Sequence, residues 1–235
     1  KPRDWELHLE VNKENAKRLS LEADVVFVHD PQPIYLPRFT PPGKVGGWVW
    51  RCHVDASRPE RSVWKHLAAA IPDYAATIFS MAAFTRPLPR PMFLVPPSID
   101  PLSEKNCTIP DQERLETLRG LGIDPERPML LQVSRFDRFK DPLGVIEAYR
   151  LVKPYHPAMQ LVLAGGPAED DPEGAEVLRE VLDHGGNDQD IHVLMLPPNA
   201  HRTINALQRS AVVVLQKSLK EGFGLTVTEA LWKYK

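Results

Sequence analysis

Short apolar runs alternate with stretches of helical periodicity along most of the chain. The apolar runs, rich in Val, Ile and Leu, predict strands at 24–28, 48–52, 76–79, 92–95, 129–133, 160–165, 191–196 and 211–216. Helical patterns predict helices over 59–71, 142–153, 173–183 and 200–209, and a last helix that begins near residue 227. Nearly continuous apolar strands that alternate with helices are typical of parallel sheets covered on both faces. The pattern therefore predicts an α/β fold built of right-handed crossover units.

Two predicted helices begin with capping signals. Asp141 followed by Pro142 matches an N-cap and the first helical position, where proline is tolerated. Ser57 and Glu60 have the spacing of a capping box, and Pro59 lies where a first-turn proline fits. Both signals support helices after these positions.

The alternation becomes regular only after residue 127, which suggests two halves. A proline-bearing stretch at 96–106 interrupts the pattern and is typical of a domain connection. We therefore predict that residues 1–101 form part of a first α/β domain, that 102–127 form a linker, and that 128–235 form part of a second α/β domain.

Composition narrows the range of partners and compartments. The 29 basic and 31 acidic residues leave a formal charge of −2, so neither nucleic acid nor an anionic membrane is expected as the main partner. No apolar run approaches the roughly 18 residues of a membrane span, and the first residues carry no signal-peptide core. Cys52 and Cys107 match no metal-ligand spacing and are too few for a disulfide framework. A reduced, cytoplasmic protein without a metal ion is the expectation.

Candidate chemistry follows the strands of the second half. Ligands of parallel sheets bind beyond the carboxyl ends of the strands. Arg135 and Lys140 come directly after the strand at 129–133, and such a pair can clamp a diphosphate. The alternative is a pair of solvated loop cations, which is the usual state of a lone Arg and Lys.

Two carboxylates, Glu221 and Glu229, bracket a glycine-bearing turn before the last helix. Gly222 and Gly224 permit close backbone approach to a ligand, and a helix N-terminus attracts anions. A carboxylate at such a position can accept hydrogen bonds from sugar or ribose hydroxyls. Glu229 also fits a purely structural role, as the capping-box partner of Thr226.

A histidine stands at the carboxyl end of two strands in the first half. His29 follows the strand at 24–28, and His53 follows the strand at 48–52. One such histidine is more often a structural hydrogen-bonding group than a catalyst, but two at the same sheet edge favour a site.

These residues together resemble a known family. The set formed by Ser134, Arg135, Lys140, the EGFG stretch at 221–224 and Glu229 is similar to the pattern of the retaining glycosyltransferases of GT-B architecture, family GT4. The stretches VHDPQP (28–33), WRCHVDASRP (50–59), PPSIDPLSEKN (96–106), VSRFD (133–137) and EGFGLTVTEALWK (221–233) resemble, within that family, the glycosyltransferring trehalose synthases. This resemblance runs along essentially the whole chain.

The resemblance implies roles on the side of the sugar donor. Arg135 and Lys140 would neutralise the diphosphate of a nucleoside-diphosphate glucose, Glu229 would hold its ribose, and Glu221 would hold its glucose. The groups that would complete the donor site are those of Gly222, Phe223, Gly224, Leu225 and Thr226.

The resemblance also implies an acceptor site and a mechanism. His53 would lie near the anomeric carbon, and His29, Asp30 and Gln32 would seat a free glucose. Transfer with retention would make α,α-trehalose reversibly, by front-face attack in which the leaving phosphate takes the acceptor's proton. No cofactor or metal ion is implied, and a homodimer is expected.

The implied fold is of GT-B type, with two Rossmann-like parallel-sheet domains facing a cleft. Members of the family are longer at both ends, so both domains are expected to be incomplete in this chain, and the chain alone is not expected to be active. Two alternatives remain open: a retaining trehalose phosphorylase of the same family, which uses phosphate in place of a nucleotide, and a truncated, non-catalytic module that binds nucleotide sugars.

Overall fold

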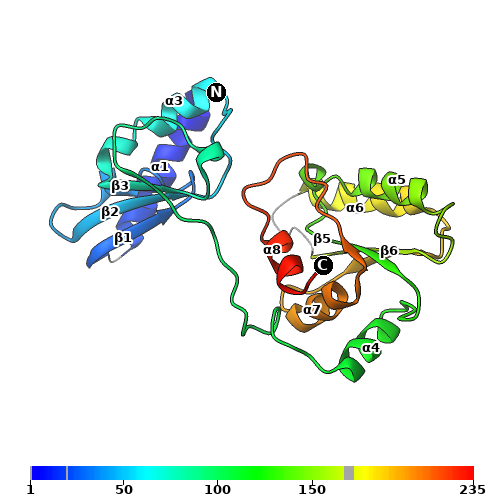
Figure 1. The fold of residues 1–235 in the computed structure, drawn as a ribbon. Coiled ribbons are helices and arrows are strands. Elements are labelled where there is room, and N and C mark those ends of the chain that lie inside the picture. The colour runs from blue at the N-terminus through cyan, green and yellow to red at the C-terminus, as the bar shows by residue number, and fades with distance from the viewer. Residues whose placement is uncertain (1, 20, 167–171) are drawn as a thin grey trace. The chain divides into compact units, whose positions relative to one another are not determined.

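The computed structural model describes residues 2–19, 21–166 and 172–235, which form two compact units, Lys1–Pro97 and Ser98–Lys235. Figure 1 shows that each unit carries its own sheet and helices. The helices described are too short or too polar to cross a bilayer.

The first unit contains a parallel sheet in the order β1-β2-β3-β4. Its strands are β1 (Ala23–His29), β2 (Val45–Cys52), β3 (Ala76–Phe79) and β4 (Met92–Leu94). All four lie where the apolar runs predicted strands. The register pairs His29 with Arg51, so the carboxyl ends of β1 and β2 meet at one edge of the sheet.

Helices α1 (Pro2–Arg18) and α3 (Arg61–Ala68) pack against one face of this sheet, and α2 (Leu36–Phe39) contacts α1 (Figure 1). The shared core includes the indole of Trp50, whose ring meets Phe79 edge-on at 5.9 Å between centroids. The opposite face of the sheet differs from the prediction, because Val25, Phe27 and Phe93 are exposed among the described residues.

The polar helix α1 was not predicted. Its buried side includes Asn12 and Ala16, and a polar residue at an inward position conceals the apolar periodicity. Asn12 donates to the carbonyls of His8 and Gln32, and its own side-chain oxygen accepts the Tyr35 amide. Hydrogen bonds as well as apolar contacts therefore dock α1.

The predicted capping box at the start of α3 is wrong. Glu60 is itself the N-cap, and its carboxylate accepts the amide of Val63 at 2.9 Å. The Ser57 amide instead donates to Asp55. The helix therefore begins at Arg61, after Pro59 rather than at it.

The second unit has a parallel sheet in the order β7-β6-β5-β8. Its elements are α4 (Asp111–Gly120), β5 (Met129–Val133), α5 (Pro142–Val152), β6 (Gln160–Gly165), α6 (Pro172–Gly185), β7 (Ile191–Met195), α7 (His201–Ser210), β8 (Val213–Val214) and α8 (Leu225–Trp232). The predicted N-cap is confirmed, since Asp141 accepts the Gly144 amide and Pro142 begins α5.

This sheet is covered on both faces, as the continuous apolar strands predicted. Met129 and Leu131 pack with α4 and α7, whereas Leu130 packs with α5 and α6. Figure 1 shows these two helix pairs on opposite sides of β5 and β6. Alternate side chains of one strand thus belong to two cores.

The segment predicted as a linker carries α4 and belongs to the second unit. Glu113 on α4 forms a two-pronged ion pair with Arg202, at 2.6 and 2.7 Å. Arg114 donates to Ser210 across the same helix pair. The low apolar content of α4 hid it from the sequence pattern, because charged contacts as well as Leu118 hold it to α7.

Candidate functional site

The loop after β5 begins in close contact with the end of β6. The Ser134 amide donates to Ala164, and a Cβ placed on Gly165 would lie 2.0 Å from the Ser134 carbonyl oxygen. Arg135 then extends from the loop with 61% of its side chain exposed, and its guanidinium lies 3.4 Å from Asp137. This guanidinium is the more accessible of the two predicted diphosphate ligands.

Several bonds fix the turn that carries Lys140. Asp137 accepts the Phe139 amide at 2.7 Å, and the buried Gln132 side chain donates to the Lys140 carbonyl at 2.7 Å. Arg138 points to α6, where it binds Glu180 through two 2.9 Å hydrogen bonds. Arg138 therefore anchors the loop to α6, whereas Arg135 extends from the loop with a largely exposed side chain.

Lys140 and Glu221 form an ion pair at 2.6 Å. The same carboxylate accepts hydrogen bonds from Gln216 at 2.7 Å, from Ser218 at 3.2 Å and from the Gly222 amide at 3.1 Å. Burial acts to raise the pKa of Glu221, but Lys140, the Gly222 amide and Ser218 outweigh it, so that the pKa lies below its ordinary value. Glu221 is an ionised, oriented acceptor.

The N-terminus of α8 lies beside the carboxyl end of β5. The Thr226 hydroxyl donates to the Val133 carbonyl at 3.4 Å. Gly224, in the left-handed region at φ 84°, is the N-cap, and the helix begins at Leu225. The structure therefore gathers Lys140, Glu221 and the positive end of a helix dipole around one sheet edge, as the strand-end argument predicted.

Glu229 does not cap α8. It lies within the helix with only 5% of its surface exposed. Its Oε1 is 2.7 Å from the Lys105 ammonium, and its Oε2 accepts the Gln208 amide at 3.0 Å. The capping-box alternative is wrong because the N-cap is Gly224, not a residue three positions before Glu229.

A buried lysine lies beneath this carboxylate. Lys233 donates to the side chains of Asn106 and Gln208 at 2.8 Å each, and to the Glu229 carbonyl at 3.3 Å. Burial lowers its pKa to about 8 although the Glu229 charge acts to raise it. Through Lys233, the C-terminal end of α8 is thus hydrogen-bonded to Asn106, near the start of the second unit, and to Gln208 on α7.

In the first unit the structure brings His29 and His53 together. Their Nδ1 and Nε2 atoms are 2.8 Å apart, and the rings stack with centroids 5.1 Å apart. Asp30, in the left-handed region at φ 69°, accepts the His53 amide at 2.9 Å. Burial lowers the pKa of His53, the Asp30 charge acts to raise it, and Arg51 and His29 lower it. One ring of the pair must donate and the other accept.

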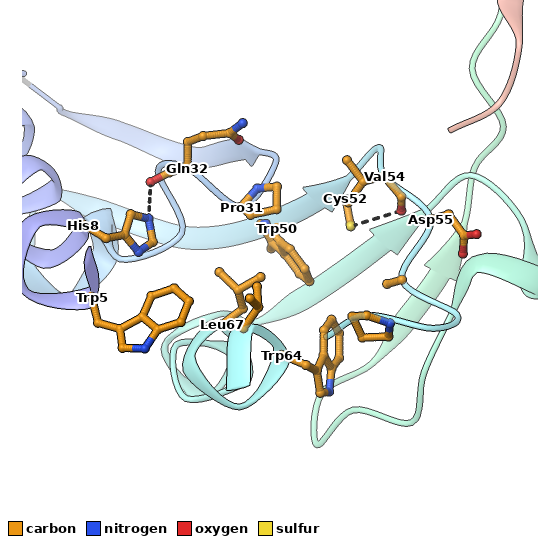
Figure 2. A pocket seen from close by; sticks show the side chains of 13 residues that line it. Trp5, His8, Pro31, Gln32, Trp50, Cys52, Val54, Asp55, Trp64 and Leu67 are labelled. Carbon is orange, nitrogen blue, oxygen red and sulfur yellow. Dashed lines mark hydrogen bonds between the residues drawn. The ribbon is translucent and has the colours of Figure 1, made fainter. Parts of the chain in front are cut away.

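Gln32 contacts α1 through its backbone carbonyl. Its carbonyl accepts from His8 at 2.7 Å and from Asn12 at 2.8 Å, while its side chain is exposed. Figure 2 shows the amide pointing away from a nearby cavity of about 340 Å³, which is walled by the indoles of Trp5, Trp50 and Trp64. In this structure, the backbone of Gln32 rather than its side chain lies at that cavity.

Sequence reasoning missed the groups that orient the two glutamates. These are Lys105, Gln208, Gln216, Ser218 and Lys233. No spacing rule joins Lys105 to Glu229, because the contact is made only when the chain folds. Within the described ranges, no group of His, Cys, Asp and Glu is arranged to hold a metal ion.

Two protein-family models match the chain. Residues 1–86 match the trehalose synthase N-terminal domain, and residues 113–232 match the glycosyl transferases group 1. The trehalose synthase of Pyrococcus horikoshii is 47% identical over 98% of this chain and 56% of its own length. That of Rubrobacter xylanophilus is 45% identical over 98% of this chain and 57% of its own length. The chain thus spans little more than half the length of these relatives.

Solved structures share the fold at low identity. The UDP-forming α,α-trehalose-phosphate synthase of Burkholderia xenovorans superposes with a TM-score of 0.75 at 18% identity, covering 96% of this chain and 60% of that one. The predicted α/β fold class of GT-B type, with a parallel sheet in each of two units, is confirmed.

Proposed function

Because the chain belongs to the trehalose synthase family within the glycosyl transferases group 1, we propose that it forms part of a retaining glucosyltransferase. The enzyme would transfer glucose from a nucleoside-diphosphate glucose to free glucose and make α,α-trehalose, reversibly. The carrying observation is the Lys140–Glu221 pair at the N-terminus of α8, beside the carboxyl end of β5.

The donor's diphosphate would bind where positive charge gathers. Arg135 offers a largely exposed guanidinium, and the first turn of α8 offers backbone N–H groups at the positive end of its dipole. Lys140 would contact the phosphate from the opposite side while still holding Glu221. Charge stabilisation of this kind favours the departing diphosphate more strongly as its negative charge develops.

Glu221 would hold the donor glucose through its hydroxyls. Lys140, Gln216 and Ser218 all meet Oε2 of Glu221, whereas Oε1 accepts the Gly222 amide. Since each carboxylate oxygen has about two acceptor positions, Oε1 is the oxygen that would accept a sugar hydroxyl. The lowered pKa of Glu221 keeps it an acceptor at neutral pH. Gly222, Phe223 and Gly224 would approach the sugar with their backbone, and the Leu225 and Thr226 amides would meet the distal phosphate.

The reaction would proceed on one face of the sugar. The bond from the anomeric carbon to the diphosphate oxygen breaks, and a bond from that carbon to an acceptor hydroxyl oxygen forms. The acceptor's proton passes to the leaving phosphate oxygen, so no protein nucleophile and no cofactor are needed. In the first unit, His29, Asp30 and Gln32 would seat the acceptor glucose, and His53 would lie near the anomeric carbon.

A product assay tests the proposal. UDP-glucose or ADP-glucose is incubated with glucose and the longest natural form of the protein, and trehalose is detected by chromatography. Arg135→Ala should abolish most of the product, whereas Arg119→Ala, on the exposed side of α4, should leave it unchanged. Release of glucose 1-phosphate from trehalose and phosphate, with no nucleotide-dependent product, would instead identify a phosphorylase. No product in either assay would favour a non-catalytic nucleotide-sugar-binding module.

A further inference from the structure

We propose that Lys105 is a positioning residue of the nucleotide site, which holds the side chain of Glu229 aimed at the ribose. This inference deepens the proposed function and rests on it. The observation that carries it is the 2.7 Å contact between the Lys105 ammonium and Oε1 of Glu229, whose other oxygen accepts Gln208.

Glu229 is too buried to act without a counter-ion. With 5% of its surface exposed, its negative charge would be costly to keep unless another group compensates it. The Lys105 ammonium lies within ion-pair distance of this carboxylate, and 30% of the Lys105 side chain remains exposed. A ribose diol could therefore donate to the free acceptor positions of Glu229 while Lys105 stays in place.

Hydrogen bonds from α7 and α8 hold the backbone on both sides of Lys105. The carbonyls of Glu104 and Cys107, on either side of it, both accept the Asn205 side chain at 2.8 Å. The Asn106 carbonyl accepts Arg209 at 3.0 Å and the Trp232 indole at 3.3 Å. Lys233 adds a bond to the Asn106 side chain. The backbone that carries Lys105 is thus pinned to both α7 and α8, which is more than a flexible surface lysine would need.

Lys105 would act on the ribose through Glu229. The 2.7 Å contact fixes Oε1 of Glu229, and the amide of Gln208 fixes Oε2, so the carboxylate keeps one orientation towards a ribose diol. Loss of Lys105 should then weaken binding only of nucleotides that present a ribose diol.

The test compares UDP and ADP with their 2′,3′-dideoxy counterparts by calorimetry on the longest natural form of the protein. Lys105→Met should weaken UDP or ADP binding by about 10- to 100-fold, the range expected for one hydrogen bond to a charged group. Lys105→Arg should restore most of the affinity. The dideoxy nucleotides should bind the parent chain and Lys105→Met equally.

A matched control is Lys153→Met. Lys153 pairs with Asp190 at 2.5 Å near the start of β7, at the opposite edge of the same sheet. Its loss should lower the unfolding midpoint but leave nucleotide affinity unchanged. Circular dichroism and the unfolding midpoint would show whether each variant is folded. If Lys105→Met is not folded, Lys105→Gln takes its place in the test.

Each remaining result would overturn the inference. Equal weakening of ribose and dideoxy nucleotides by Lys105→Met would assign Lys105 a structural role, as would unchanged binding of both. If the parent chain binds neither UDP nor ADP, the proposed donor site fails first, and the role of Lys105 fails with it. This failure can be told apart from a failure of the Lys105 role alone, because it is seen with the parent protein and requires no variant.

Discussion

Lys140 and Glu221 lie 81 positions apart in the chain, yet their charged atoms are 2.6 Å apart at the N-terminus of α8. One group was predicted to meet the donor's phosphate and the other its glucose. The structure shows that they first meet each other. Lys140, Gln216 and Ser218 meet Oε2 of Glu221, and the Gly222 amide meets Oε1. A sugar hydroxyl that donates to Oε1 need not separate the pair, because each carboxylate oxygen has about two acceptor positions. The ion pair is therefore already formed between the phosphate and sugar parts of the proposed site.

Replacing Glu221 with Gln should reduce trehalose formation by about 10²- to 10³-fold, the usual effect of losing one well-placed charged contact in a transition state. The amide keeps the size of the side chain but removes its charge, so affinity for UDP or ADP should change little. Steady-state rates with UDP- or ADP-glucose and glucose, together with nucleotide binding, check this.

Glu116→Gln serves as the control, since Glu116 is exposed on α4 and binds Gln112. Near-normal turnover of Glu221→Gln would contradict the proposed contact between Glu221 and the donor glucose.

Replacing Gly165 with Ala should destabilise the second unit by about 2–3 kcal/mol, as overpacking in a rigid place does. The new Cβ would lie 2.0 Å from the backbone oxygen of Ser134. Because this contact is with the backbone, it cannot be relieved by rotating a side chain. Urea unfolding followed by circular dichroism measures the change.

Gly120→Ala is the matched control. A Cβ there would meet no atom within 4 Å, and the position ends α4. Alanine should leave stability unchanged or raise it by up to about 1 kcal/mol. Equal stability of the two variants would contradict the close approach of β6 to the Ser134 loop.

Replacing Asp190 with Asn should cost about 1–2 kcal/mol of unfolding free energy near neutral pH. Arg127 at 2.7 Å and Lys153 at 2.5 Å hold the pKa of Asp190 at about 2, against an ordinary 3.8. A depressed carboxyl pKa stabilises the fold above the unfolded value, and this stabilisation is lost as the pH falls through the folded value.

The difference between parent and variant should thus be full above about pH 4 and vanish towards pH 2. Unfolding curves at several pH values test it. Asp111→Asn, whose carboxyl is exposed beside Arg114, should change stability by less than about 0.5 kcal/mol. A pH-independent cost of Asp190→Asn would point to packing instead of charge.

The pKa of His53 should lie below its ordinary value, mainly because of burial. Asp30→Asn should lower it further, since it removes a negative charge that acts to raise it while Asn still tolerates the left-handed backbone. His29→Ala should raise it. Proton NMR titration of the His53 ring measures all three.

If Asp30→Asn raised the pKa of His53, the Asp30 carboxylate would not face the ring, and the assignment of the pair would need revision. A titration of His53 unaffected by His29→Ala would contradict the stacked pair with its 2.8 Å contact.

The sequence was most informative where burial was complete. The strands β5 and β6 are buried along their whole length, so their apolar runs alone located them. The cap at Asp141 was visible because a cap and its helix are neighbours in the chain. The strand-end rule also placed Arg135, Lys140 and Glu221 at one edge of one sheet. Helices α1 and α4 were not predicted, because polar contacts as well as apolar residues dock them and their apolar periodicity is therefore weak.

By itself, then, the sequence determined the alternation of strands and helices and the family to which the chain belongs. Only the tertiary structure decided the partners of the site residues: Lys105 for Glu229, His29 for His53, and Gln216 and Ser218 for Glu221. Burial and local propensity act on residues close together in the chain and produce a periodic pattern of apolar residues in the sequence. Ion pairs between distant residues produce no such pattern, because their energy depends on a distance that exists only after the sheets and helices have packed.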